Sequence, residues 1–145
     1  MAPPHRRTPV PSALVLSGLI EVATGALAGW PYTLVRQDPD AARRLLGIKS
    51  GARIRQWHLD LAMLGGLTVA VGTAVPDAPK WASVPLGVGA WTNAMSFLPL
   101  AFAPEIDKHP VYRATAGASF ISTSLGFTGM AIVAARRRRA ARRAS

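Results

Sequence analysis

A few polar side chains stand inside long apolar stretches of this sequence, and their types could do chemistry. The stretches contain two carboxylates, Glu21 and Asp60, and one histidine, His58. An ionisable residue in such surroundings is costly, so by default it faces the interior and marks function. Glu21 is a candidate for proton transfer or ligand binding, and Asn93 is a candidate substrate contact. The alternative for both is a structural hydrogen bond between helices. Asp60 is expected to pair with a nearby arginine.

His58 begins a row of small residues at helical spacing. Ala62 and Gly65 follow it on the same face of a helix. A flat cofactor requires this arrangement, because an imidazole can bind a metal at the ring's edge while small residues let the ring approach the backbone. His5 and His109 lie outside the apolar stretches, so His58 is the candidate axial ligand. The alternative is an ordinary buried histidine held by a hydrogen bond.

Four apolar stretches must position these residues. They contain 19, 19, 22 and 22 residues and cover Ser12–Trp30, Trp57–Val75, Trp81–Phe102 and Ala114–Ala135. A hydrocarbon core of roughly 30 Å requires about 20 apolar residues of helix. The sequence therefore predicts an all-α integral membrane protein, with residues 12–135 forming a single four-transmembrane-helix bundle. A cleaved signal peptide is the alternative for the first stretch, but its length and Glu21 at its centre favour a retained helix.

Small residues and turn signals predict how these helices are joined and packed. Each helix has one face of small or polar residues, which suits close packing in lipid. The fourth has such a face at steps of four and three, made of Thr115, Ser119, Ser122, Gly126 and Gly129. Between the first two helices, Asp38 as N-cap, Pro39 at the first position and Gly47 as the stop predict one short helix on the membrane surface. The turn Pro76–Pro79 predicts that the second and third helices are antiparallel neighbours.

Charge and composition narrow the functional classes. The net charge is +10, but six of the 17 basic residues lie in 136–143, directly after the last apolar stretch. A juxtamembrane arginine cluster is typical of a topology anchor at anionic lipid headgroups, so we predict no nucleic-acid partner. The chain has no cysteine, which excludes disulfides, iron–sulfur clusters and thiolate zinc. We expect a disordered arm in residues 1–11, a basic tail in residues 136–145, and a multi-pass inner-membrane protein with cytoplasmic termini.

Two short stretches resemble a known family. The second apolar stretch opens on Gln56–Gly65, read QWHLDLAMLG, and the third contains Trp91–Phe97, read WTNAMSF. With the spacing of the four helices, these stretches resemble the styrene oxide isomerases and the related hydroxylaminobenzene mutases. The chain departs from the family pattern at two positions. Leu64 stands where the family has Asn, six residues after the histidine, and Phe97 stands where it has Tyr.

The resemblance implies a cofactor and a reaction. Family members are small trimers that hold haem b between subunits, with a helix-2 histidine as axial ligand; His58 matches that position. Their ferric iron acts as a Lewis acid on an epoxide oxygen, and a hydride shift gives the aldehyde. Asn93 matches the helix-3 asparagine of the pattern. The resemblance therefore implies a homotrimer that rearranges a small apolar or aromatic substrate, with Asn93 and Glu21 as the catalytic candidates.

Two other functional classes compete with this interpretation. A small membrane scaffold or accessory protein without a cofactor would explain the loss of the Asn and Tyr that orient the epoxide. A proton-coupled transporter would use Glu21, but four helices without a broken segment or a repeat are a poor basis for alternating access.

Overall fold

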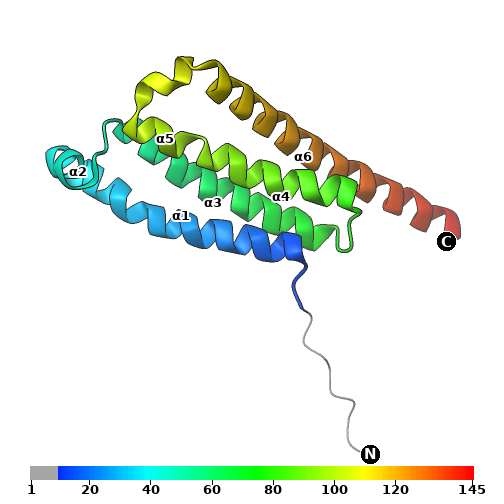
Figure 1. The fold of residues 1–145 in the computed structure, drawn as a ribbon. Helices are drawn as coiled ribbons and strands as arrows, with labels where there is room; N and C mark the ends of the chain where they lie inside the picture. Colours follow the sequence, from blue (N-terminus) through cyan, green and yellow to red (C-terminus); the bar gives the residue numbers. More distant parts are fainter. Residues whose placement is uncertain (1–9) are drawn as a thin grey trace, which may run out of the picture.

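The computed structural model describes residues 10–145, and these residues are almost entirely helical, without β-strands. The long helices are α1 (Ala13–Gln37), α3 (Gly51–Ala74), α4 (Lys80–Met95) and α6 (Pro110–Ala144). The shorter α2 (Pro39–Leu46), α5 (Phe97–Phe102) and the 3₁₀ helix η1 (Pro104–Lys108) connect them (Figure 1). The all-α prediction is confirmed. The predicted arm, residues 1–11, lies outside the described residues except for its last two.

The helices extend beyond the apolar stretches that predicted them. Helix α1 continues through Pro31 to Gln37, and α3 begins at Gly51, six residues before Trp57. Hydropathy therefore located the helices but not their ends. The predicted third helix, 81–102, is divided at Ser96 into α4 and α5. Pro99 has no N–H for the carbonyl one turn earlier, which weakens the helix at that point.

The four long helices lie side by side, and two close pairs dominate the packing. Helix α1 packs mainly on α3, α6 packs mainly on α4, and α3 contacts α4 between the pairs. Helices α1 and α6 lie on opposite sides of α3 and α4 (Figure 1) and have no extensive contact with each other. The helices therefore form a layer rather than a closed four-sided bundle.

Glycines allow the close approach of α1 and α3. A Cβ atom on Gly25 would lie 2.9 Å from the Ala62 amide nitrogen, and one on Gly65 would lie 2.8 Å from the Val22 amide nitrogen. Any larger residue would push the two backbones apart. In each of these contacts the two residue numbers add up to 87. The constant sum means that residue numbers rise along one helix as they fall along the other, so α1 and α3 are antiparallel. This interface contains the small residues predicted for the first two helices.

The α4–α6 pair uses the small face predicted for the last helix. Gly126 lies directly against the Leu86 backbone, and Ser122 donates a hydrogen bond to the Pro85 carbonyl at 3.0 Å. Ser119 is buried and its hydroxyl lies 2.7 Å from that of Thr92. Thr115 is the exception, because it is exposed and bonds within its own helix.

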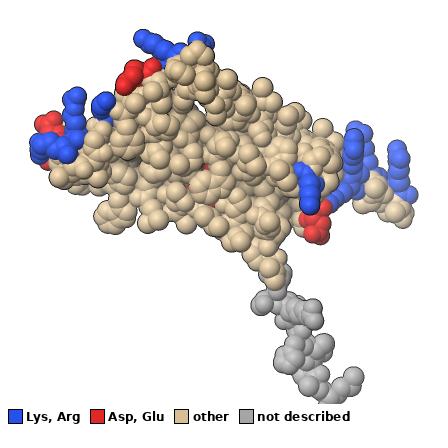
Figure 2. All heavy atoms as spheres, in the orientation of Figure 1, with Lys and Arg blue, Asp and Glu red and all other residues tan. Residues whose placement is uncertain are grey.

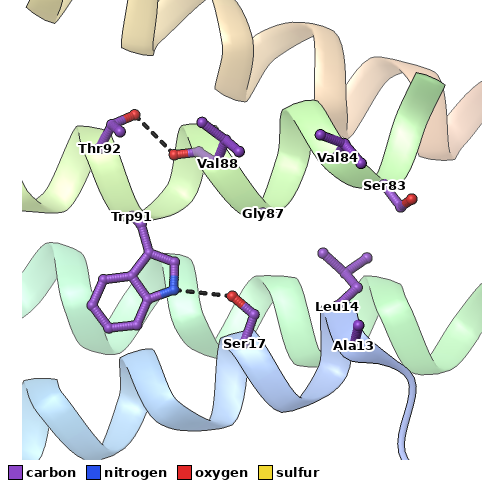
Figure 3. A pocket seen from close by; sticks show the side chains of 9 residues that line it. All are labelled: Ala13, Leu14, Ser17, Ser83, Val84, Gly87, Val88, Trp91 and Thr92. Carbon is purple, nitrogen blue, oxygen red and sulfur yellow. Dashed lines mark hydrogen bonds between the residues drawn. The ribbon is translucent and has the colours of Figure 1, made fainter. Parts of the chain in front are cut away.

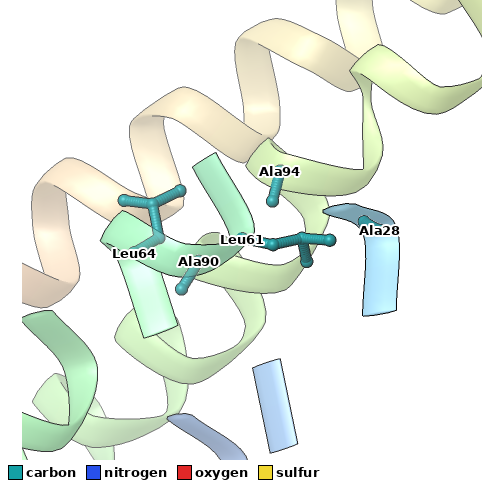
Figure 4. Packing of buried hydrophobic residues seen from close by; sticks show 5 residues of the cluster. All are labelled: Ala28, Leu61, Leu64, Ala90 and Ala94. Atoms are coloured by element: carbon teal, nitrogen blue, oxygen red, sulfur yellow. The ribbon is translucent and has the colours of Figure 1, made fainter. Parts of the chain in front are cut away.

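The core between the pairs is built from small and branched side chains. Ala28 of α1, Leu61 and Leu64 of α3, and Ala90 and Ala94 of α4 form one buried cluster (Figure 4). Ala90 and Ala94 are small, so α4 can approach α3 closely. The side chains of Leu61 and Leu64 then fill the space between the two helices. Trp57, Trp91 and Phe127 pack against the edge of this cluster.

The short helix α2 and the basic C-terminal segment of α6 are both helical. Asp38 caps α2 by accepting from the Ala41 amide at 2.8 Å, and Gly47 ends it at φ 71°. The caps predicted for this helix are confirmed. The predicted basic tail continues α6 as helix to Ala144. Arg137 of this extension donates to the backbone carbonyls of Pro76 and Asp77 in the α3–α4 turn, at 2.6 and 3.0 Å.

Two of the helices, α1 and α6, are long and apolar enough to cross a membrane. Both chain ends described here, the start of α1 and the end of α6, lie at the same end of the layer as the α3–α4 turn (Figure 1).

Candidate functional site

The His58 ring is held in one orientation against α1. Its Nδ1 lies 2.8 Å from the Gly25 carbonyl oxygen, and its ring stacks on Tyr32 at a centroid distance of 5.6 Å. A carbonyl oxygen can only accept a hydrogen bond, so Nδ1 carries the proton in this contact. The lone pair of the neutral ring is then on Nε2. Gly29 lies beside the ring, and a Cβ there would be in ordinary contact with it, 3.5 Å from the His58 Cε1 atom.

This arrangement fits an axial ligand. Metal-binding histidines commonly donate one ring N–H to a carbonyl or carboxylate, which fixes the tautomer and turns the other nitrogen to the metal. His58 is half-buried, and within residues 10–145 its single hydrogen bond is the one from Nδ1. Among these residues Nε2 therefore has no hydrogen-bond partner. The described residues contain no group of three or more His, Asp or Glu that could hold a metal ion, so a ligand role for His58 is that of a single axial donor.

The residues predicted beside His58 have different environments. Gly65 is buried against the α1 backbone, with the Gly18 carbonyl oxygen 2.9 Å from its Cβ position. The expectation that Gly65 flanks a cofactor is therefore wrong, because helix α1 occupies that space. Ala62 contacts α1 through its backbone, while its methyl group is exposed one turn from His58. A ring bound at His58 could contact Ala62 only from outside the α1–α3 pair.

Glu21 is fully buried, and neither carboxyl oxygen has a hydrogen-bond partner within residues 10–145. The alternative interpretation, a structural hydrogen bond between helices, is therefore not seen for Glu21 in the described part of the chain. Thr68 of α3 is also fully buried with an unpartnered hydroxyl. Sequence reasoning missed Thr68, although its position seven residues after the core residue Leu61 places it on the same inward face.

Asn93 is half-buried on α4, and its backbone carbonyl accepts from the Ser96 hydroxyl at 2.7 Å. No hydrogen bond joins its side chain to His58 or Glu21, all three of which are described. The three candidate residues therefore do not form one hydrogen-bonded cluster. Asp60 lies with Arg55 and Gln56 around a shallow hollow on the outside of α3.

The two departures from the family pattern lie in different surroundings. Leu64 belongs to the buried core cluster and is 7% exposed. Phe97 lies beneath the Arg53 guanidinium, whose carbon is 5.9 Å from the ring centroid. A polar group at position 64 would have to be satisfied inside the core, and leucine removes that requirement.

A groove between α1 and α4 is the second feature of interest (Figure 3). Its volume is about 500 Å³, and its lining residues are mostly apolar or small: Ala13, Leu14, Ser17, Ser83, Val84, Gly87, Val88, Trp91 and Thr92. Trp91 donates from its indole Nε1–H to the Ser17 hydroxyl at 3.0 Å across the groove. Sequence reasoning did not anticipate the groove, because it depends on the sparse contact between α1 and α4.

Comparisons with known proteins give no assignment. No protein-family model matches the chain, and no curated protein or solved structure matches it either.

Proposed function

We propose that the chain is a multi-pass membrane protein whose four long helical segments all cross the bilayer. Charged side chains gather at the two ends of the molecule, and the middle is free of them on the face shown in Figure 2, apart from a trace of one acidic residue. Large apolar side chains are exposed between those ends, including Leu27 (68%), Met63 (56%), Val88 (54%) and Phe120 (67%). One such residue from each long helix supports a lipid-facing belt.

The proposed orientation has both termini in the cytoplasm, in the inner membrane of a bacterium. The arginines at the end of α6, joined to the α3–α4 turn by Arg137, support this orientation because basic residues stay on the cytoplasmic side. The chain has no cysteine. A single cysteine placed at Ser145 would therefore report the side of the C-terminus by its accessibility to an impermeant maleimide in intact cells.

We further propose that the protein binds haem b through Nε2 of His58. The observation that carries this proposal is the 2.8 Å contact between His58 Nδ1 and the Gly25 carbonyl, which fixes the proton on Nδ1. The Tyr32 ring holds the imidazole from one side. When bound, ferric haem supplies a Lewis acid that polarises an oxygen atom of the substrate.

The rest of the cofactor site must come from outside one protomer. On the face of α3 that carries His58, Ala62 and Gly65, the side toward α1 is filled by Gly65 and the α1 backbone. The exposed methyl group of Ala62 lies on the side away from α1. A second copy of the chain could cover that side. Helices α1 and α6 have no extensive contact with each other, so both retain open faces. These open faces support the homotrimer implied by the family resemblance.

The proposed activity is a non-redox rearrangement of a small aromatic or otherwise apolar substrate, as in the styrene oxide isomerases. Leu64 is buried in the core and Phe97 is apolar, so neither position supplies the hydrogen bond to the substrate that the family's polar residues would. An apolar surrounding also excludes water, which would otherwise capture a benzylic cation. Asn93 remains the polar candidate for contact with the substrate, as the helix-3 asparagine of the family pattern.

Activity in membranes from haem-supplemented cells tests this function. Styrene oxide and phenylhydroxylamine would be supplied to membranes with wild-type protein, His58→Ala and the control His109→Ala. His109 is exposed, and its ring nitrogen caps α6 by accepting from the Val111 amide. Rearranged product should form with wild-type and His109→Ala protein but not with His58→Ala. Equal product from His58→Ala would exclude the proposed role, and a colourless, inactive wild-type protein would favour the scaffold alternative.

A further inference from the structure

The α1–α4 groove and Glu21 suggest a second site that the proposed haem function does not use. Ser17 in the groove and Gly25 beneath His58 are eight residues apart on α1, which is on the order of 12 Å along the helix. A volume of about 500 Å³ lies within the range of small-molecule sites. The groove is therefore large enough for a ligand and separate from the axial position.

Trp91 separates this groove from the protein core. Its side chain lines the groove and also packs against the core cluster that contains Ala28 and Leu61. One hydrogen bond, to the Ser17 hydroxyl, joins it to α1 (Figure 3). Contact between α1 and α4 is otherwise sparse. Trp91 therefore stands between the groove and the core cluster, and one hydrogen bond ties its side chain to α1.

Glu21 and Thr68 are buried in the part of the core that adjoins this cluster. Glu21 is one turn from Ser17 on the same face of α1. Ala28 of α1 and Leu61 of α3 belong to the same core cluster. Glu21 precedes Ala28 by seven residues, and Thr68 follows Leu61 by seven. Because α1 and α3 are antiparallel, both steps lead in the same direction in space. The two therefore occupy the next layer of the same core. Each is 0% exposed and has no side-chain hydrogen-bond partner among the described residues.

We propose that the groove and Glu21 together bind a lipophilic amine, with an apolar body in the groove and an amino group on the Glu21 carboxylate. Buried carboxylates are ordinarily paired, and within the described residues no side chain pairs with Glu21. A cationic amine supplies both the missing charge and the missing donors. The Thr68 hydroxyl accepts a further hydrogen bond from the same group. The apolar groove lining selects for molecules already dissolved in the bilayer.

Two probes of similar shape, one with and one without an amino group, distinguish the contribution of the amino group to binding from that of the apolar ring. Binding of 1-naphthylmethylamine and of 1-methylnaphthalene to purified protein in detergent would be measured by isothermal titration. We expect the amine to bind wild-type protein at least tenfold more tightly than the hydrocarbon. Glu21→Gln should weaken amine binding by about tenfold or more, because a charge-assisted hydrogen bond is lost, and should leave hydrocarbon binding unchanged.

A glycine substitution tests the groove itself. Gly87 lines it, and a Cβ there would meet only the Leu14 side chain, at 3.4 Å. Gly87→Phe should therefore fill the groove and abolish binding of both probes. Gly117 on α6 has open space around its Cβ position, so Gly117→Phe is the matched control and should bind normally.

The proposal is overturned if neither probe binds wild-type protein, or if both bind with equal affinity. It is also overturned if a folded Gly87→Phe variant binds the amine normally. Should that variant fail to fold, the effect of Glu21→Gln on the two probes decides alone. A haem spectrum that remains intact in Glu21→Gln and Gly87→Phe would show that the two sites are separate.

Discussion

His58 on α3 donates a hydrogen bond from Nδ1 to the Gly25 carbonyl oxygen on α1, 2.8 Å away. The contact spans the α1–α3 pair and occurs one turn from the site where Gly25 meets the Ala62 amide. The glycine therefore has two effects: it brings the helices together, and it places its carbonyl within reach of the imidazole. Helix packing and the orientation of the candidate ligand depend on the same residue.

Gly25→Ala should weaken both properties. The added Cβ would be 2.9 Å from the Ala62 amide nitrogen, so α1 and α3 must separate. We expect a destabilisation of about 1–3 kcal/mol, typical of overpacking, measured by thermal unfolding in detergent. Gly66→Ala is the control, because it adds a Cβ into open space on the same helix pair. Equal melting temperatures for the two variants would contradict the close approach at Gly25.

Glu21→Met should raise stability. The substitution removes two buried oxygen atoms that have no hydrogen-bond partner and replaces them with an apolar chain of similar length. An unsatisfied buried polar group costs about 1–3 kcal/mol, and most of that should be recovered as a higher melting temperature. Thr68→Val should act in the same direction and less strongly. A large loss of stability in Glu21→Met would mean that Glu21 has an internal partner.

The sequence predicted the helices better than their contacts. Asp38, Pro39 and Gly47 specify α2 through local backbone chemistry, and each acts as predicted. The small residues of α6 likewise predicted the face that packs on α4. Neither prediction required knowledge of distant residues.

The candidate site was harder to predict because small residue size is compatible with both cofactor binding and close helix packing. Gly65 is small, and small residues can flank a planar cofactor or bring two helices together. The structure shows the second use, which depends on a register with Gly18 and Val22 that the α3 sequence does not contain. The groove next to Trp91 depends in the same way on how α1 and α4 meet, 74 residues apart in the chain.

Arg137→Gln should loosen the end of α6. The guanidinium donates to two backbone carbonyls of the α3–α4 turn, and glutamine cannot reproduce both contacts. We expect a melting temperature lower by about 2–4 °C, the shift for a small loss of stability in a chain of this size. Asp77→Asn should be neutral, because Arg137 contacts the backbone of residue 77. A comparable loss in Asp77→Asn would point to an ion pair instead.

The most direct test of the central claim is the absorption spectrum of His58→Gly protein with and without added imidazole. Protein would be purified in mild detergent from haem-supplemented cells, beside wild-type and His109→Ala protein. The account predicts a Soret band in wild-type and His109→Ala protein, its loss in His58→Gly, and its return when free imidazole occupies the space left by the side chain. A Soret band of full intensity in His58→Gly without imidazole, or no band in folded wild-type protein, would contradict it.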